Sequence, residues 1–211
     1  MPRTPKRVIY RDKLGSRRLQ AEFQHLSRQM LLGALPQVSE LEMVGDNVFR
    51  WRFCLSDFDG STPGGRDLNA DLAILQRRHG RRKILMEVIF PDTYPRRPFA
   101  LRIVRPRMAW YTGHVTAGGT VCLEALSQSG SRGAWQQSYD VEAILQQVIS
   151  NMTTCERVRI RTPTGPGGMS GPLRLDLDGK WSGLSPMAEY SEAEARAALG
   201  RTEATHLRIG W

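Results

Sequence analysis

The sequence predicts an α+β fold in which helices flank a small antiparallel sheet. Apolar residues repeat at helical spacing on both sides of a central region of the 211-residue chain, and that region contains runs typical of β-strands. A long stretch without a clean period follows the last of these runs. Because the strand runs follow one another closely, we expect a meander of about four strands, then an irregular segment and further helices.

The first helix is predicted over residues 13–32, and Pro36 ends the segment. Four apolar residues fall on one face of this helix: Leu19, Phe23, Leu26 and Met30. Further along, residues 56–69 are rich in Asp, Gly, Ser and Pro and are predicted to form a loop. A short helix through Leu72 and Leu75 is expected to follow this loop.

Two more helices are predicted in the second half of the chain. The stronger pattern is an unbroken helical repeat of Val141, Ile144, Leu145, Val148, Ile149 and Met152. Either Ser138 or Asp140 can cap its start. Ser191 and Glu194 form a capping box for a final helix that runs towards His206.

The strands are predicted from alternation and from turn residues. Residues 41–44 and 48–55 flank a Gly-Asp-Asn turn and are expected to pair as a hairpin. In the second of these runs apolar residues alternate with mostly basic ones, so one face is buried and the other is solvated or faces a partner. Further strands are expected at residues 84–90 and 99–104, joined by an extended connection in which three prolines prevent regular pairing.

Composition indicates an ordinary globular protein, with 40% hydrophobic and 24% charged residues. Residues 1–13 are expected to be a basic flexible tail without a secretory signal, and residues 14–211 a single domain in which residues 161–186 form a loop or linker. No membrane partner is expected, since no apolar run reaches the ~20 residues of a span. The net charge of +9 favours acidic partners. The basic cluster at residues 77–83 is expected to be a solvated turn, with a nuclear-import or phosphate-binding patch as the alternative.

The three cysteines, Cys54, Cys122 and Cys155, are widely spaced and fit neither a disulfide framework nor a paired metal site. We therefore predict no metal or other cofactor, and a reducing compartment, the cytosol or the nucleus. Cys54 falls on the polar face of its strand, and both it and Cys155 are expected to be inert.

Cys122 stands in a different context, because it follows the pair Gly118-Gly119 and lies between two apolar residues. Glycines can hold backbone angles that other residues cannot. Val121 and Leu123 can bury on either side and leave the thiol over a shallow surface. On residue type alone, a cysteine in an apolar setting is most often an inert core residue.

Five segments, in their order along the chain, resemble the ubiquitin-conjugating enzymes, which carry ubiquitin as a thioester on one cysteine. They are residues 16–26, the proline-rich connection Phe90–Phe99, the motif Gly119-Thr120-Val121-Cys122-Leu123, Trp135, and the helix that begins at Val141. Residues 68–75, the glycine pair, residues 135–139 and the ending Tyr190–Trp211 are similar to the Q-type branch. The resemblance covers roughly residues 14–211 and implies a UBC-like fold with a Q-type C-terminal extension.

The resemblance implies an acyltransferase that accepts ubiquitin or a ubiquitin-like protein from an activating enzyme on Cys122, and transfers it to an acceptor nucleophile. A ubiquitin ligase is a further possible partner. The nucleophile is a thiolate, and no Cys-His-Asp triad is required because the incoming thioester is already a good acyl donor. Arg17 and Arg18 match the face that the family presents to its activating enzyme, although a solvated helix face is the plain alternative. No acidic residue is clearly placed to deprotonate an acceptor amine, and Glu156 is a candidate.

Two departures from the family pattern concern the site. Most of the family carries His-Pro-Asn, with the asparagine eight residues before the cysteine, where this chain has His114. The Q-type branch also lacks the tripeptide. His114 can donate an N–H to the developing oxyanion, or it can cap a loop carbonyl. The family's usual ligase-contact positions read Arg96 and Gln136-Gln137 here, which implies that a RING-type ligase docks differently.

Two alternative functions remain open. One is a catalytically inactive relative that serves as a scaffold or binding module, which the intact Gly-x-x-Cys-Leu motif argues against. The other is nucleic-acid binding, which the positive charge motivates but for which the chain carries no recognised motif. Trp135 is expected to be structural, since a tryptophan is more often a core or lid residue than a chemical one.

Overall fold

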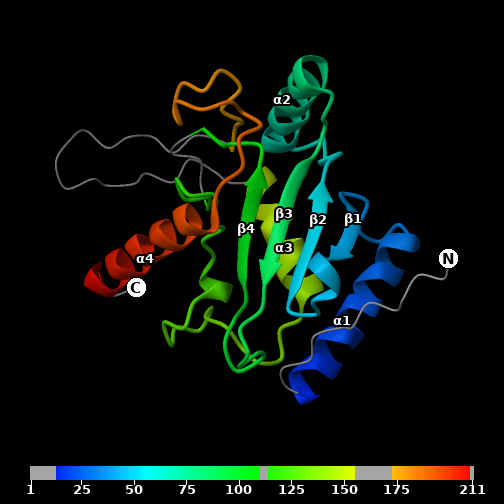
Figure 1. Cartoon of the computed structure of the whole chain (residues 1–211), viewed down its shortest axis with the longest axis vertical. Helices are drawn as coiled ribbons and strands as arrows, with labels where there is room; N and C mark the ends of the chain where they lie inside the picture. The colour runs from blue at the N-terminus through cyan, green and yellow to red at the C-terminus, as the bar shows by residue number, and fades with distance from the viewer. Residues whose placement is uncertain (1–12, 110–113, 155–172, 210–211) are drawn as a thin grey trace.

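The order of elements predicted from the sequence is found in the computed structural model, which describes residues 13–109, 114–154 and 173–209. Four strands form one sheet in sequential order, each antiparallel to its neighbour: β1 (Val38–Met43), β2 (Arg50–Leu55), β3 (Ile84–Ile89) and β4 (Ala100–Arg105). Helix α1 (Lys13–Leu31) lies on the β1 side of this sheet, and α4 (Glu192–Ile209) lies on the β4 side (Figure 1). The α+β class and the four-stranded meander are confirmed.

The first hairpin differs from the prediction at both of its strands. β1 begins at Val38, before the predicted start at residue 41, and β2 begins at Arg50. The early part of β1 was not predicted because its sequence is polar. Ser39 nevertheless pairs with Cys54, and the register shifts between Ser39 and Glu42. β2 starts late because the backbone N–H of Phe49 donates to the side chain of Asn47, a local turn bond that competes with strand pairing.

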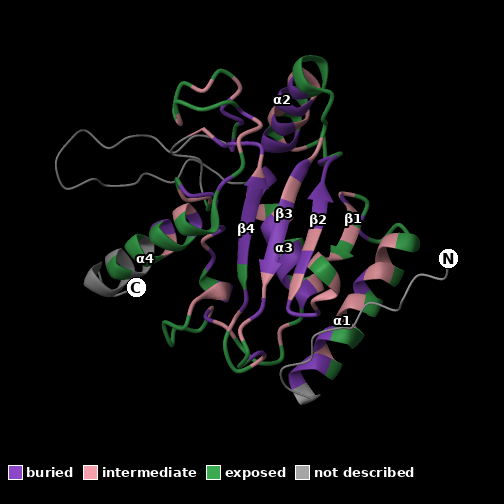
Figure 2. Cartoon of the chain, viewed as in Figure 1, coloured by how far each residue is buried: buried purple, intermediate pink, exposed green. Residues whose placement is uncertain are grey.

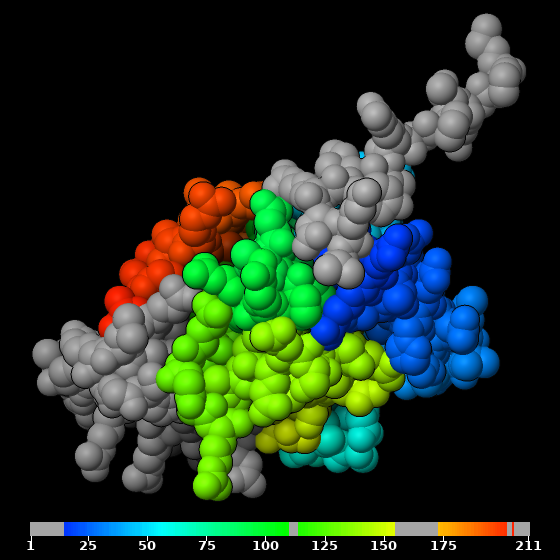
Figure 3. Space-filling view, turned by 90° about the horizontal axis from the view of Figure 1, so that it is seen from below, coloured from blue at the N-terminus to red at the C-terminus, as the bar shows by residue number. Residues whose placement is uncertain are grey.

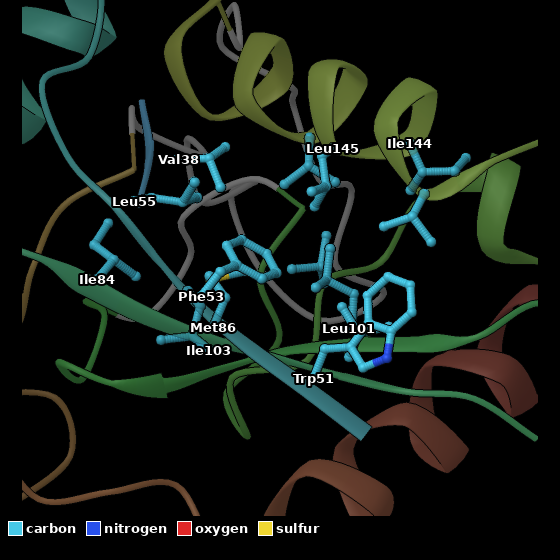
Figure 4. Close-up of a cluster of buried hydrophobic side chains, with 14 of the residues drawn as sticks. Val38, Trp51, Phe53, Leu55, Ile84, Met86, Leu101, Ile103, Ile144 and Leu145 are labelled. Carbon is cyan, nitrogen blue, oxygen red and sulfur yellow. The ribbon is translucent and has the colours of Figure 1, made fainter. Parts of the chain in front are cut away.

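Helix α3 (Val141–Thr154) crosses one face of the sheet and supplies five buried residues to the core: Val141, Ile144, Leu145, Val148 and Met152. Figure 4 shows Ile144 and Leu145 of this helix above the sheet residues Phe53, Met86 and Leu101. All five are at most 2% exposed, and burial of each such side chain contributes about 1.5–3 kcal/mol relative to leaving it in water. Figure 2 shows buried residues concentrated along the strands. The predicted start at Val141 is confirmed, and Asp140 is a cap, since its carboxylate accepts from the N–H of Ala143 at 2.8 Å.

Helix α2 (Pro63–His79) corrects the prediction of a loop over residues 56–69. It begins at Pro63 because Thr62 caps it, accepting a hydrogen bond from the N–H of Gly65 at 3.1 Å. The glycines that suggested a loop allow close packing instead. A Cβ atom on Gly64 would lie 2.5 Å from the carbonyl oxygen of Thr153 at the end of α3.

The outer face of the sheet is charged, as the alternation in β2 predicted. Its centre is Glu87, which is fully buried beneath Arg50, Arg52 and Arg102. Burial would raise the pKa of Glu87, but the hydrogen bonds and charges of these arginines hold it below the usual value. Cys54 lies on the same face, is 6% exposed and donates to Glu40.

The basic cluster at residues 77–83 forms the end of α2 and the turn into β3, as the plain reading predicted. Gly80 provides the left-handed cap at φ +69°. Several of the cations are paired: Arg78 with Asp178 at 2.7 Å, and Lys83 with Glu40 at 2.8 Å.

The segment predicted as a loop at residues 161–186 is described from residue 173 onwards. This part packs against α2 and against the residues that follow β4. Arg174 forms two hydrogen bonds with the buried carboxylate of Asp71, and Leu175 pairs with Met108 in an isolated bridge. Helix α4 follows, and its capping box is confirmed by reciprocal bonds between Ser191 and Glu194. Across the described ranges, no helix has the length and apolar character needed to cross a membrane.

Candidate active site

A small hairpin carries Cys122. Its two arms meet where Val115 pairs with Val121, and its turn is closed by a bond from the N–H of Gly119 to the carbonyl of Thr116 at 2.9 Å. Gly119 has φ +80°, a conformation that glycine adopts without strain and that short hairpin loops require. This confirms the predicted role of the second glycine in the motif.

The hairpin also pairs with β4, so the backbone beside the cysteine is fixed from two sides. The N–H of Val121 donates to Leu101 at 2.9 Å, and the N–H of Ile103 donates to Gly119 at 2.8 Å. Val121 and Leu123 are 4% and 5% exposed, whereas Cys122 between them is partly exposed. The thiol-bearing residue therefore sits at the surface between two buried anchors, as expected from the sequence.

His114 lies opposite Cys122 on the hairpin. The N–H of Cys122 donates to the carbonyl of His114 at 2.7 Å, and the Nδ1 atom of His114 lies 3.2 Å from the carbonyl oxygen of Cys122. When Nδ1 carries the proton and donates this bond, a neutral ring has no proton left on Nε2. In this arrangement the imidazole braces the loop. His114 is exposed and has φ +60°, an unusual value for a residue other than glycine.

Trp135 connects the proline-rich segment to the residues that follow Cys122. Its indole N–H donates to the carbonyl of Pro95 at 2.8 Å, and its ring packs against Tyr94, Phe99 and Tyr139. These contacts fit the structural role predicted for the tryptophan.

The three ligase-contact candidates lie close to this contact, and all three are exposed: Arg96, Gln136 and Gln137. Arg96 follows Pro95 and Gln136 follows Trp135, so the indole hydrogen bond brings the two positions together. In Figure 3 the proline-rich connection and the residues after Cys122, green to yellow-green, form a face between α1 in blue and α4 in orange and red.

Arg17 and Arg18 have different surroundings in the structure. Arg17 is exposed, but Arg18 is only 31% exposed in its side chain and donates to the carbonyls of Gln137 and Tyr139 at 2.6 and 2.7 Å. Arg18 also pairs with Glu22, whose carboxylate accepts from the Tyr94 hydroxyl. Arg18 therefore ties α1 to the segment before α3, a role that the sequence did not suggest.

Glu124 is an acidic residue near Cys122 that was not predicted from the sequence as a candidate. It follows Cys122 by two residues, and its carboxylate accepts from the hydroxyl of Ser131 at 2.5 Å. Gly133 makes room for it, because a Cβ atom there would lie 2.4 Å from the carboxylate. The other acidic candidate, Glu156, and Cys155 lie outside the described residues.

A groove of about 290 Å³ adjoins the cysteine segment. It is lined mainly by apolar side chains, among them Phe99, Leu101, Val121, Leu126 and Leu199. Leu199 belongs to α4, so the C-terminal helix reaches the surroundings of the site. In the described ranges, no three His, Cys, Asp or Glu side chains gather as a metal site would require.

Comparison with known proteins gives the family. The sequence model described as "Ubiquitin-conjugating enzyme" matches residues 81–159. A Q-like ubiquitin-conjugating enzyme protein of Drosophila melanogaster is 31% identical over 198 residues, which is 94% of this chain and 53% of that protein. The Q-like protein 1 of Mus musculus is 26% identical over 171 residues, covering 81% of this chain and 85% of that one. The chain thus spans about half the length of the Drosophila relative.

Among solved structures, the chain is similar to human ubiquitin-conjugating enzyme E2 G1, with a TM-score of 0.46 and 19% identity over 64% of this chain and 92% of that one. The matching family model and these relatives support a place for this chain in the ubiquitin-conjugating enzyme family. The relatives are Q-type proteins, which supports the Q-type branch of that family.

Proposed function

We propose that this chain accepts ubiquitin, or a ubiquitin-like protein, as a thioester on Cys122 and passes it to an acceptor nucleophile. The observation that carries the proposal is the placement of Cys122. Its backbone is held by the bond to His114 and by the pairing of the hairpin with β4, while its own side chain is partly exposed between two buried neighbours. Such a residue is accessible to a bulky protein partner and has a fixed position.

The chemistry exchanges one thioester for another. The Cys122 thiolate attacks the carbonyl carbon at the modifier's C-terminus, a new C–S bond forms, and the bond to the activating enzyme's cysteine breaks with that sulfur leaving as a thiolate. In the transfer step an acceptor nitrogen or oxygen attacks the same carbon. The Cys122 thiolate leaves, and the acceptor's proton passes to solvent. Neither step changes an oxidation state, and the intermediate needs no cofactor.

The proposed partner surfaces adjoin one another. Arg17 on α1 is the exposed candidate for contact with the activating enzyme, while Arg96 and Gln136 are candidates for contact with a ligase. Arg18 joins these regions through its bond to the carbonyl of Gln137. We therefore propose that the activating enzyme and a ligase bind overlapping surfaces of the chain, one after the other.

A gel assay without reductant tests the proposal. The chain is mixed with ubiquitin, activating enzyme and ATP, and an adduct that disappears on adding thiol is expected. Cys122→Ser should give an ester that resists thiol, or no adduct, whereas Cys54→Ser should load like the parent because that thiol is buried. Absence of any adduct with ubiquitin or with other modifiers would overturn the proposal and favour an inactive scaffold.

A further inference from the structure

The C-terminal segment contacts the hairpin of Cys122 through Tyr190 and the first turns of α4. Gly118 lies so close to α4 that a Cβ atom would meet the carbonyl oxygen of Glu194 at 2.3 Å and the Cβ atom of Ala198 at 2.8 Å. At Gly119 a Cβ atom would lie 2.6 Å from the ring of Tyr190. The hydroxyl of Thr120 donates to the carbonyl of Ala195 at 2.9 Å. All three residues before Val121 thus touch the segment that starts at Tyr190.

Tyr190 is itself anchored to β4 and to the residues after it. Its N–H donates to the carbonyl of Val104 at 2.8 Å, and its own carbonyl accepts from Arg102 at 2.7 Å. Its hydroxyl accepts from the N–H of Met108 at 2.9 Å. The guanidinium of Arg107 lies 4.4 Å from the centre of the ring.

Arg107 connects the same anchor to α4. It forms two hydrogen bonds with the carboxylate of Glu194, at 3.0 and 3.2 Å, and is 5% exposed. Tyr190 is 3% exposed and Thr120 is also 3% exposed. The contacts of Tyr190 and Thr120 are therefore shielded from water, where hydrogen bonds hold their partners more firmly than at the surface. The Glu194 side chain that pairs with Arg107 is 41% exposed.

We propose that Tyr190 and the first turns of α4 are positioning elements of the active site, which set the place of the Cys122 thiol by holding Gly118, Gly119 and Thr120 against β4. The glycine pair then has two separate purposes. Gly119 supplies the left-handed turn and a flat surface for the tyrosine ring, and Gly118 permits the approach of α4. The use of that thiol in acyl transfer rests on the proposed function, but the positioning can be measured without it.

The first test follows the unmodified full-length chain. Thr120→Val removes the bond to Ala195 and retains the shape of the side chain. Thr153→Val is the matched control, since Thr153 is 6% exposed and its hydroxyl bonds only within α3 in the described residues. We expect Thr120→Val to change the rate at which iodoacetamide modifies Cys122 by about threefold to tenfold, the range that one hydrogen bond spans. Amide exchange at Val121 and Cys122 should rise in parallel.

Gly118→Ala should act more strongly than Thr120→Val, because the new methyl group must displace α4. A Tyr190→Phe variant should have a small effect, since it keeps the ring on Gly119 and loses only the bond from Met108. In the Thr153→Val control, iodoacetamide modification of Cys122 and amide exchange at Val121 and Cys122 should proceed at rates within twofold of the parent. The positioning role would be overturned if Thr120→Val and Gly118→Ala also kept both of these rates within twofold of the parent. If the variants change thiol reactivity while even the parent fails to load ubiquitin, the positioning stands and the proposed function fails.

Discussion

The backbone N–H of Cys122 donates to the carbonyl oxygen of His114 at 2.7 Å, and the imidazole of His114 in turn lies 3.2 Å from the carbonyl of Cys122. The two residues therefore face each other across the hairpin, Cys122 through its main-chain N–H and carbonyl and His114 through its main-chain carbonyl and its imidazole. This relationship separates the two functions open to His114, because a side chain engaged in bracing the loop is not aimed at a reacting carbonyl.

His114→Ala is expected to slow loading and discharge alike, each by no more than about tenfold, as loss of one loop hydrogen bond allows. Single-turnover discharge of pre-loaded protein to free lysine and to a small hydroxyl acceptor measures the second step. An oxyanion donor would give a different pattern, with loading intact and discharge slower by ~10²–10³. The melting temperature should also fall, since the brace is lost.

Arg17 and Arg18 should behave differently although they are adjacent. Arg18→Gln is expected to cost roughly 2 kcal/mol of stability, because it loses charged hydrogen bonds to the carbonyls of Gln137 and Tyr139. Arg17→Glu should leave the unfolding free energy unchanged and slow loading from the activating enzyme, most clearly at low salt. Denaturant unfolding and loading rates measure the two effects. Equal loading by Arg17→Glu and the parent at low salt would assign Arg17 to a merely solvated face.

Cys54 should be unreactive in the folded protein. Burial, with the hydrogen bond and charge of Glu40 beside it, raises the pKa of Cys54 to about 12, so at pH 8 only about one thiol in 10⁴ is ionised. Iodoacetamide at pH 8 is expected to modify Cys122 and to leave Cys54 intact, as read by mass spectrometry of peptides. Denaturant should remove this protection. Comparable labelling of both cysteines in the folded chain would contradict the account.

Glu87 should make stability depend on acid. Its folded-state pKa is lowered, so the pairs with Arg50, Arg52 and Arg102 stabilise the fold fully above the unfolded value of about 4.3, and this contribution is lost as the pH falls through the folded value. Glu87→Gln should cost about 3 kcal/mol at pH 7, since it leaves buried arginine charge unpaired. The gap between parent and variant, measured by unfolding from pH 7 down to pH 3, should shrink below about pH 4. A gap that stays constant over that range would show that the charge of Glu87 is not what stabilises the sheet.

The features that could be predicted from sequence were those carried by local patterns. Helical spacing gave α1 and α3 nearly to the residue, the Ser191–Glu194 box gave the start of α4, and the glycine–cysteine motif gave the position of the thiol. The start of α2 was not predicted because Gly64 locally indicates a loop. In the structure, Gly64 allows α2 to pack closely against the backbone of Thr153 at the end of α3.

The remaining features depend on contacts between residues far apart in the chain, which no local pattern records. In the sequence, Arg18 cannot be told from a cation on a solvated helix face. Only the structure shows its hydrogen bonds to the carbonyls of Gln137 and Tyr139. The same holds for Tyr190, whose ring lies on Gly119 some seventy positions earlier. These long-range contacts decide which residues support the site.

The most direct test of the account is to find which sulfur carries the modifier. The chain is loaded with ubiquitin, its unoccupied thiols are blocked with N-ethylmaleimide in denaturant, the thioester is then cleaved with hydroxylamine, and newly exposed thiols are labelled with iodoacetamide. If Cys122 carries the modifier, peptides containing Cys122 take the second label and those containing Cys54 and Cys155 take only the first. A second label on Cys54 or Cys155, with Cys122 blocked throughout, would contradict this assignment.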